Sequence, residues 1–150
     1  MIFTSNNPLV TISRNKPTLF LAGSIDLELE GNWRLEISNE LGTNINYLDP
    51  THVNHAKLDK LGWQEHIEWE LEAMEMADFI LLNFLPEAQS PISLVELGLN
   101  SLSKKLVVSC PPEFHQSQYV HVFCNHYSLP VFDELKPAVE LIKKKLSIIS

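Results

Sequence analysis

The sequence predicts an α/β fold of the three-layer, flavodoxin-like class with a five-stranded parallel sheet. Short apolar runs that fit buried strands alternate along the chain with stretches at helical spacing. The segments between successive strands are long enough for helical crossovers, which parallel pairing requires. With 150 residues, the chain is expected to form one main domain over 18–150, preceded by an N-terminal arm over 1–17.

The predicted elements alternate regularly from the first strand onward. The run TLFLAG at 18–23 is short, apolar and ended by glycine, as in a buried parallel strand. A helix over 32–41 follows, with Trp33 and Ile37 at helical spacing and Asn32 at its N-cap. Further strands are predicted at 45–50, 77–84, 105–110 and 129–132, and further helices at 62–76, 90–103, 118–127 and 136–149.

Composition and charge narrow the classes of function. The formal net charge of −8 argues against binding to nucleic acid polymers and to anionic membranes, because that affinity comes mainly from Lys and Arg. A small phosphorylated ligand stays compatible with this charge, since a few backbone N–H groups can hold it. Cys110 and Cys124 are too few for a disulfide framework, and no secretory signal or membrane span is recognisable. We therefore expect a reduced, cytoplasmic protein.

The carboxyl ends of the predicted strands are where a ligand is expected to bind. In open parallel sheets, ligands occupy the crevice outside these ends, near the point where the strand order reverses. The first strand delivers Gly23, Ser24 and Ile25 to this edge. The second strand delivers Asp49, and the third delivers Asn83.

Glu96 lies inside the apolar stretch SPISLVELGLN of a predicted helix, which has Ser90 as N-cap and Pro91 as its first residue. An ionised carboxylate withdrawn from water is costly unless it is paired, so this position needs an explanation. One explanation is a polar stripe, formed with Ser93 and Asn100, that faces solvent. The other is a functional role, because the N-terminal end of this helix opens on the strand-end crevice.

Glu70 is the second unusual carboxylate. Helical spacing in 63–76 places it near the centre of a face that carries Trp63, Ile67 and Met74. It is either a structural Glu paired with a cation or histidine of the core, or a functional group. Two carboxylates from neighbouring helices that meet at the crevice suit glycosidic chemistry, in which one attacks or stabilises an oxocarbenium-like centre.

The sequence gives little indication of a metal or a cofactor. Two histidine clusters do not have the spacing of a four-ligand zinc site, so no metal is expected. The sequence carries none of the glycine-rich dinucleotide, phosphate-loop or serine-hydrolase motifs, and we expect no cofactor. The two clusters are His52, His55 and His66, and His121, Cys124 and His126.

Four stretches, taken in order, resemble the nucleoside 2-deoxyribosyltransferase-like superfamily, most closely its small members with a PISLxELG motif. The resemblance runs from about residue 18 to the C-terminal helix and implies a flavodoxin-like α/β fold. It also implies a homodimer or larger homo-oligomer, because members of the superfamily complete their site with residues of a neighbouring subunit. The stretches are LFLAGSI, WQEHIEWELEAMEMADFILLNF, SPISLVELG and KLVVSCPPEF.

The resemblance implies roles for individual residues. Glu96, in the ELG motif, is implied as the nucleophile on C1′ of the sugar, and Glu70 as the acidic residue that orients the sugar or the nucleophile. The turn of Gly23, Ser24 and Ile25 resembles that of the related deoxynucleoside 5′-monophosphate N-glycosidases. This similarity implies that the turn lies beside the sugar or its phosphate.

Two positions depart from the transferase pattern. Ser90 stands where many transferases have an aspartate that helps to protonate the leaving base, and where the monophosphate glycosidases have a serine. Leu19 stands where transferases often have a tyrosine near the nucleophile. Both departures favour hydrolysis or a changed substrate over full transferase activity.

The leading hypothesis is cleavage or transfer at the N-glycosidic bond of a nucleoside or nucleotide through a glutamate nucleophile. Such a nucleophile has to stay ionised, so Glu96 is expected to be hydrogen-bonded and near the positive end of its helix. The alternatives are a non-catalytic nucleotide-binding or sensing module on the same fold and a purely structural oligomer. The enzyme and the binding module are both expected to have a nucleoside or nucleotide as their small-molecule partner.

Overall fold

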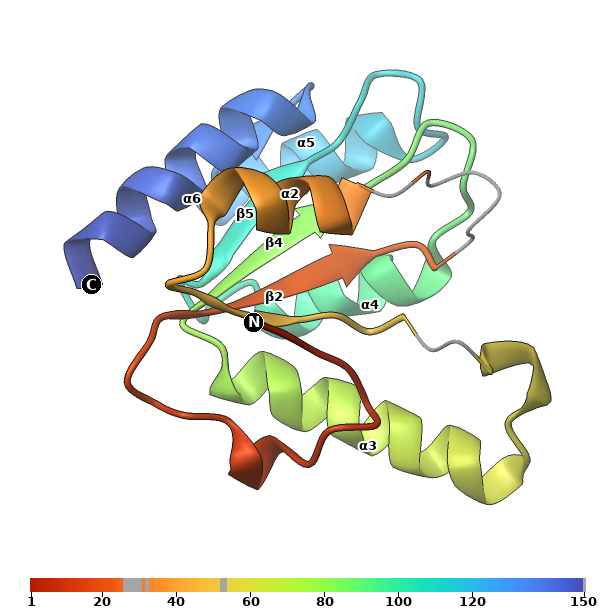
Figure 1. The fold of residues 1–150 in the computed structure, drawn as a ribbon. Coiled ribbons are helices and arrows are strands. Elements are labelled where there is room, and N and C mark those ends of the chain that lie inside the picture. The colour runs from red at the N-terminus through yellow and green to blue at the C-terminus, as the bar shows by residue number, and fades with distance from the viewer. Residues whose placement is uncertain (26–30, 32, 52–53, 150) are drawn as a thin grey trace.

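The chain forms three layers, with a parallel sheet in the middle and helices on both of its faces (Figure 1). The structure is a computed structural model that describes residues 1–25, 31, 33–51 and 54–149. All pairings between neighbouring described strands are parallel. The predicted α/β class with a parallel sheet is therefore confirmed.

The sheet has six strands in the order β1-β3-β2-β4-β5-β6. From β3 to β6 this is the flavodoxin-like order, in which the chain moves outward from β2 first on one side and then on the other. The prediction of five strands missed β1, since a strand of only two residues shows no pattern; it pairs with β3 at the edge of the sheet. The strands are β1 (Ile2–Phe3), β2 (Thr18–Gly23), β3 (Asn46–Leu48), β4 (Phe79–Asn83), β5 (Leu106–Ser109) and β6 (Val131–Phe132).

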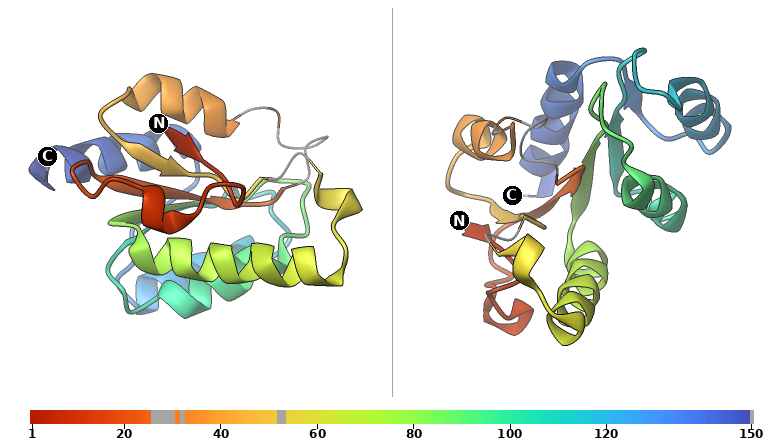
Figure 2. Two further views of the ribbon diagram at one scale, coloured as in Figure 1. Left: turned by 60° about the horizontal axis from the view of Figure 1, so that its bottom comes forward. Right: turned by 90° about the vertical axis from the view of Figure 1, so that its right-hand side faces the viewer.

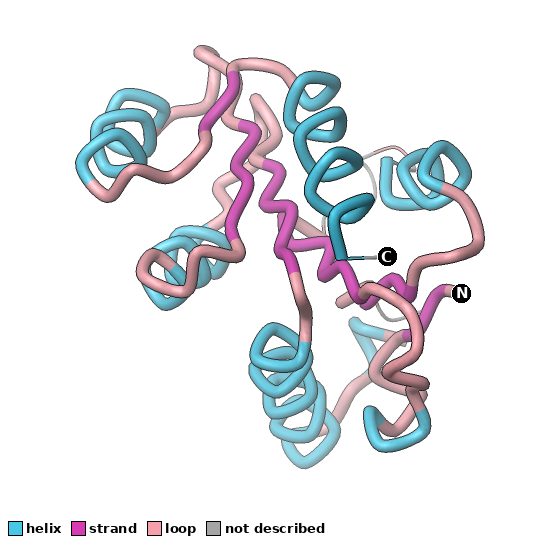
Figure 3. Tube along the Cα trace, turned by 90° about the vertical axis from the view of Figure 1, so that its left-hand side faces the viewer, coloured by secondary structure: helices cyan, strands magenta, loops and turns pink. Residues whose placement is uncertain are grey.

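Helices of the described part of the chain cover both faces of the sheet (Figures 2 and 3). Helices α2 (Trp33–Leu41) and α6 (Leu135–Ile149) share the first face. The second face is covered by α3 (Lys60–Met76), α4 (Pro91–Asn100) and α5 (Ser117–His126). Short 3₁₀ turns precede β2 and α3, at η1 (Leu9–Thr11) and η2 (His55–Lys57). The predicted N-cap Asn32 lies outside the described residues.

Alternate side chains of each strand enter two separate cores. In β2, Leu19 and Leu21 pack with α2 and α6, while Phe20 and Ala22 pack with the three helices of the opposite face. All four side chains are almost fully buried. Because a buried Leu or Phe contributes about 1.5–3 kcal/mol, this central strand is held firmly from both sides. The carboxyl end of β2 is thereby a rigid support for the residues that follow it.

The buried face of α3 differs from the predicted one. Trp63 and Ile67 were expected inside, yet they are 39% and 48% exposed. Met74 is buried as expected, but His66 and Trp69 are buried in place of the other two. The reason is the N-terminal arm, which packs on this side of the helix and accepts a hydrogen bond from Trp69 Nε1 at Asn7 O (3.0 Å). The helical period was correct, but the sequence did not indicate what would cover the helix.

None of the described helices is both long enough and apolar enough to cross a membrane.

Candidate functional site

Glu96 lies on the inner face of α4. Its side chain is only 6% exposed, and Ser93 and Asn100 of the same stripe are buried as well. The explanation of this stripe as a solvent-exposed one is therefore wrong. The outward face of α4 is apolar instead, with Val95 63% and Leu99 60% exposed. Polar residues inside and apolar residues outside are the reverse of an ordinary surface helix, so α4 is not explained by core packing alone.

Burial changes the protonation of Glu96. Its pKa is raised from 4.5 to about 8, mainly by desolvation and also by the negative charge of Glu70, while the positive charge of Arg34 opposes this rise. The expectation that Glu96 stays ionised is thus wrong for the chain without a ligand. Glu96 is the sixth residue of α4, and the favourable effect of a helix N-terminus is confined to about its first turn. The helix cannot compensate for the lost hydration of this carboxylate.

Glu70 projects from α3 at the rim of the same region. Its side chain is 16% exposed, and its Oε1 lies 3.4 Å from Nε2 of the buried His66. His66 is thus a core histidine with which the structural explanation could pair Glu70. The negative charge of Glu70 also raises the pKa of Glu96, so the two carboxyl groups interact electrostatically. Such an interaction can keep one carboxyl group protonated while the other carries a charge that suits a developing positive charge.

Gly23 and Asn83 end two neighbouring strands side by side. They are paired in register, and Asn83 is paired in turn with Ser109 of β5. Gly23 has φ +152°, and a Cβ at this position would lie 2.6 Å from Asn83 O. Only glycine allows the two strand ends to approach so closely. The side chain of Asn83 is buried at this edge.

Arg34 joins the ends of β2 and β3. The guanidinium is almost fully buried and donates to the carbonyl oxygens of Leu21 (3.0 Å), Gly23 (3.2 Å) and Ser24 (3.1 Å). Its Nε lies 3.6 Å from Asp49 Oδ1. Arg34 thus holds three residues that were predicted to line the site, namely Gly23, Ser24 and Asp49.

Asp49 also organises the loop that follows β3. Asp49 Oδ1 also accepts hydrogen bonds from the backbone N–H (2.9 Å) and the hydroxyl (2.7 Å) of Thr51, so the loop after β3 is tied to the same carboxylate. Ile25 follows Ser24 and is partly exposed.

Sequence reasoning missed Arg34, although its spacing of three residues from Ile37 puts it on the inner side of α2.

Ser90 begins α4 in an unusual conformation. Its backbone is left-handed (φ 50°, ψ 46°), and its side chain makes no capping hydrogen bond. Ser90 is the N-cap and Pro91 occupies the first helical position, both as predicted, although the Ser90 side chain does not cap the helix. Ser90 is 7% exposed, and among the described residues its Oγ meets no hydrogen-bond partner. A strained residue with an unsatisfied buried hydroxyl is typical of a functional position.

Histidines of both clusters take part in ring packing or hydrogen bonding within the fold. The rings of His55 and His66 pack against each other at 4.8 Å, and His55 packs on Trp63 at 4.5 Å. His121 Nε2 lies 2.9 Å from the carbonyl oxygen of Cys110 and faces Asp133. No group of three metal-ligating side chains gathers within the part of the chain that the structure describes. His52 lies outside that part.

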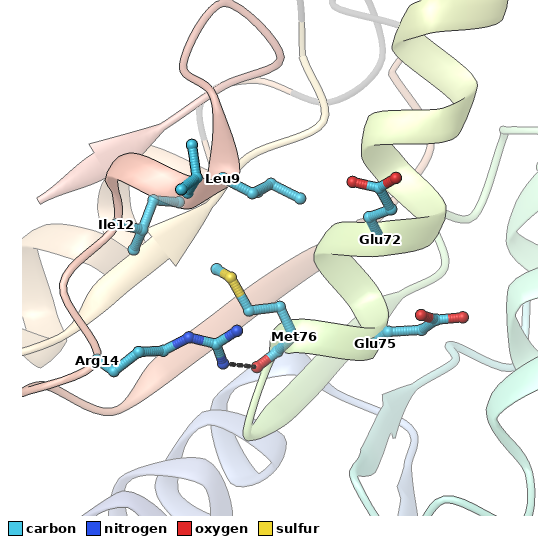
Figure 4. A pocket seen from close by; sticks show the side chains of 7 residues that line it. Leu9, Ile12, Arg14, Glu72, Glu75 and Met76 are labelled. Carbon is cyan, nitrogen blue, oxygen red and sulfur yellow. Dashed lines mark hydrogen bonds between the residues drawn. The ribbon is translucent and has the colours of Figure 1, made fainter.

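A pocket of about 550 Å³ lies between the N-terminal arm and the end of α3. Figure 4 shows its lining, where Arg14 donates to the carbonyl of Met76 (3.4 Å), the last residue of α3. Because β4 begins three residues later, this pocket lies toward the amino ends of the strands. None of the predicted site residues lines it. It is therefore separate from the site around Glu96.

Comparison with known proteins identifies one matching family. A family model described as nucleoside 2-deoxyribosyltransferase like matches residues 16–114. The match contains the carboxyl ends of β2, β3 and β4, together with Glu70 and Glu96. A search of curated proteins finds no match.

Proposed function

The chain belongs to the nucleoside 2-deoxyribosyltransferase-like family, and from this premise we propose that it cleaves or transfers at the N-glycosidic bond of a nucleoside or nucleotide. Family membership indicates a transferase-like enzyme and a small nucleoside as its ligand. One observation carries the finer proposal that Glu96 is the nucleophile. This carboxyl group is buried, under the opposing influence of Glu70 and of Arg34, which binds the end of β2.

The proposed reaction has two steps. Ionised Glu96 attacks C1′ of the sugar, and the base leaves with the electron pair of the C–N bond and takes a proton from water or a nearby group. Water or an acceptor base then attacks C1′ of the glycosyl ester, which releases the sugar and restores the carboxylate. Glu70 orients the sugar or the nucleophile, and its negative charge suits the oxocarbenium-like character of both transition states.

The remaining residues hold the substrate. The turn after β2 lies beside the sugar or its phosphate, and the buried hydroxyl of Ser90 is available to exchange a hydrogen bond with it. Arg34 fixes this turn through its carbonyl oxygens and supplies the cation that favours ionised Glu96. The proposed substrate-binding residues are Gly23, Ser24, Ile25, Asp49, Asn83 and Ser90.

A non-catalytic nucleotide-binding module is the second candidate. The observation that favours it is the pKa of about 8 for Glu96, which leaves this carboxyl group mostly protonated at neutral pH. A protonated carboxyl donates a hydrogen bond to a ligand but does not attack C1′. The two candidates differ in whether product is formed after binding.

We also propose a homo-oligomer, supported by the apolar outer face of α4. Ile92 and Val95 are each 63% exposed, Leu99 is 60% exposed, and Leu102, in the turn after α4, is 80% exposed. A row of this size in solvent is typical of an interaction surface. A second copy of the chain would cover it directly behind Glu96.

Chromatography for released base tests the proposed function. The protein is incubated with ribonucleosides, deoxyribonucleosides and their 5′-monophosphates, each with and without an acceptor base. Release without an acceptor indicates hydrolysis, and release that needs one indicates transfer. If none of these compounds releases base while one of them raises the melting temperature, the binding module is the correct function.

A further inference from the structure

The N-terminal arm crosses α3 beside Glu70. Ser5 Oγ lies 2.9 Å from Nδ1 of His66, and Trp69 Nε1 donates to Asn7 O at 3.0 Å. His66 precedes Glu70 by one helical turn, and Trp69 is its neighbour in sequence. Both side chains are largely buried, at 3% and 8% exposure. The arm is thus fixed to α3 at two points that flank a proposed site residue.

His66 connects the arm to the carboxylate. Its Nδ1 faces Ser5, and its Nε2 lies 3.4 Å from Glu70 Oε1. When the Ser5 hydroxyl donates to Nδ1, the ring hydrogen is on Nε2, which faces the Glu70 carboxylate. The rings of His55 (4.8 Å) and Trp63 (6.0 Å) hold the imidazole from another side. The hydrogen bond with Ser5 at Nδ1 therefore orients the His66 ring, while Nε2 lies near Glu70 outside hydrogen-bond geometry.

We propose that Ser5 is a positioning residue for the site, because it sets the tautomer and orientation of His66 and thereby the placement of Glu70. This inference rests on the proposed function, in which Glu70 orients the sugar or the nucleophile. Ser5 lies outside the 16–114 segment that matches the family. The contact is therefore a property of this chain that family membership does not supply.

Two variants and one matched control test the proposal. Ser5→Ala removes the hydroxyl, Ser5→Thr retains it, and Ser13→Ala makes the same change at an exposed serine elsewhere in the arm. The first readout is the ¹⁵N NMR spectrum of the His66 ring, which distinguishes the two tautomers and needs no activity. The second is the separation of kcat from KM for base release.

We expect Ser5→Ala to change the His66 tautomer and to lower kcat about tenfold with little change in KM, as for other residues that orient a site group. Ser5→Thr restores both readouts, and Ser13→Ala alters neither. An unchanged tautomer in Ser5→Ala overturns the inference, as does a changed tautomer with unchanged kcat. If the wild-type protein releases no base from any substrate, the proposed function fails separately, and the NMR spectrum alone decides whether Ser5 sets the state of His66.

Discussion

Replacing Glu96 by glutamine is expected to stabilise the folded protein at neutral and alkaline pH. The structure raises the pKa of Glu96 from 4.5 to about 8, so the folded state binds its proton more tightly than the unfolded chain does. Stability from this proton is present below pH 4.5 and is lost as the pH rises toward 8. Over the whole interval the loss is roughly 5 kcal/mol, and by pH 7 it is about 3 kcal/mol. The glutamine side chain of the variant does not titrate, so the variant loses none of this stability.

Urea unfolding at pH 5, 7 and 8.5 measures this effect. The free energy of unfolding of Glu96→Gln should exceed that of the wild type by an increasing margin from pH 5 to pH 8.5, reaching about 3 kcal/mol near neutral pH. Glu87→Gln, at an exposed position, is the matched control and should follow the wild type at each pH. Parallel pH profiles for wild type and Glu96→Gln would refute the reasoning, because Glu96 would then titrate in the folded state as it does in the unfolded chain.

Three further predictions concern activity, backbone and assembly. Because only ionised Glu96 is nucleophilic, kcat/KM for base release should rise about tenfold per pH unit below the pKa of about 8 and level off above it; a profile flat from pH 6 to 9 contradicts this. Gly23→Ala should lower the free energy of unfolding by about 2–4 kcal/mol, since its Cβ would meet Asn83 O; unchanged urea midpoints would be the contrary result. Leu99→Asp should convert an oligomer to a monomer in sedimentation, and an unaltered mass rules out α4 as the interface.

The core of the fold was predictable because it follows from local patterns. Continuous apolar runs such as TLFLAG identify strands that are buried on both faces, and the intervening helices dictate parallel pairing. The parallel topology that follows from these patterns is enough to place Gly23 and Asn83 at one edge of the sheet. Strand β1 and the buried side of α3 could not be predicted, because they depend on where the arm packs rather than on local periodicity.

The sequence singled out the residues of the candidate site, but not their electrostatics. Glu96 stood out as a carboxylate among apolar residues, yet its protonation depends on desolvation and on Arg34, which lies 62 positions away in the sequence. The left-handed backbone of Ser90 was equally hidden, since serine before proline at a helix start is ordinarily a capping residue. Long-range contacts therefore determine the charge of Glu96, whose unusual position local sequence identifies.

Base release by Glu96→Gln compared with wild type tests the central claim most directly. The variant has nearly the same shape as the wild type and is expected to be at least as stable at neutral pH, so a loss of activity cannot be assigned to unfolding. The account predicts that the wild type releases base from at least one nucleoside or nucleotide and that Glu96→Gln releases none, although it still binds that compound. Base release by Glu96→Gln at the wild-type rate would contradict the assignment of Glu96 as the nucleophile.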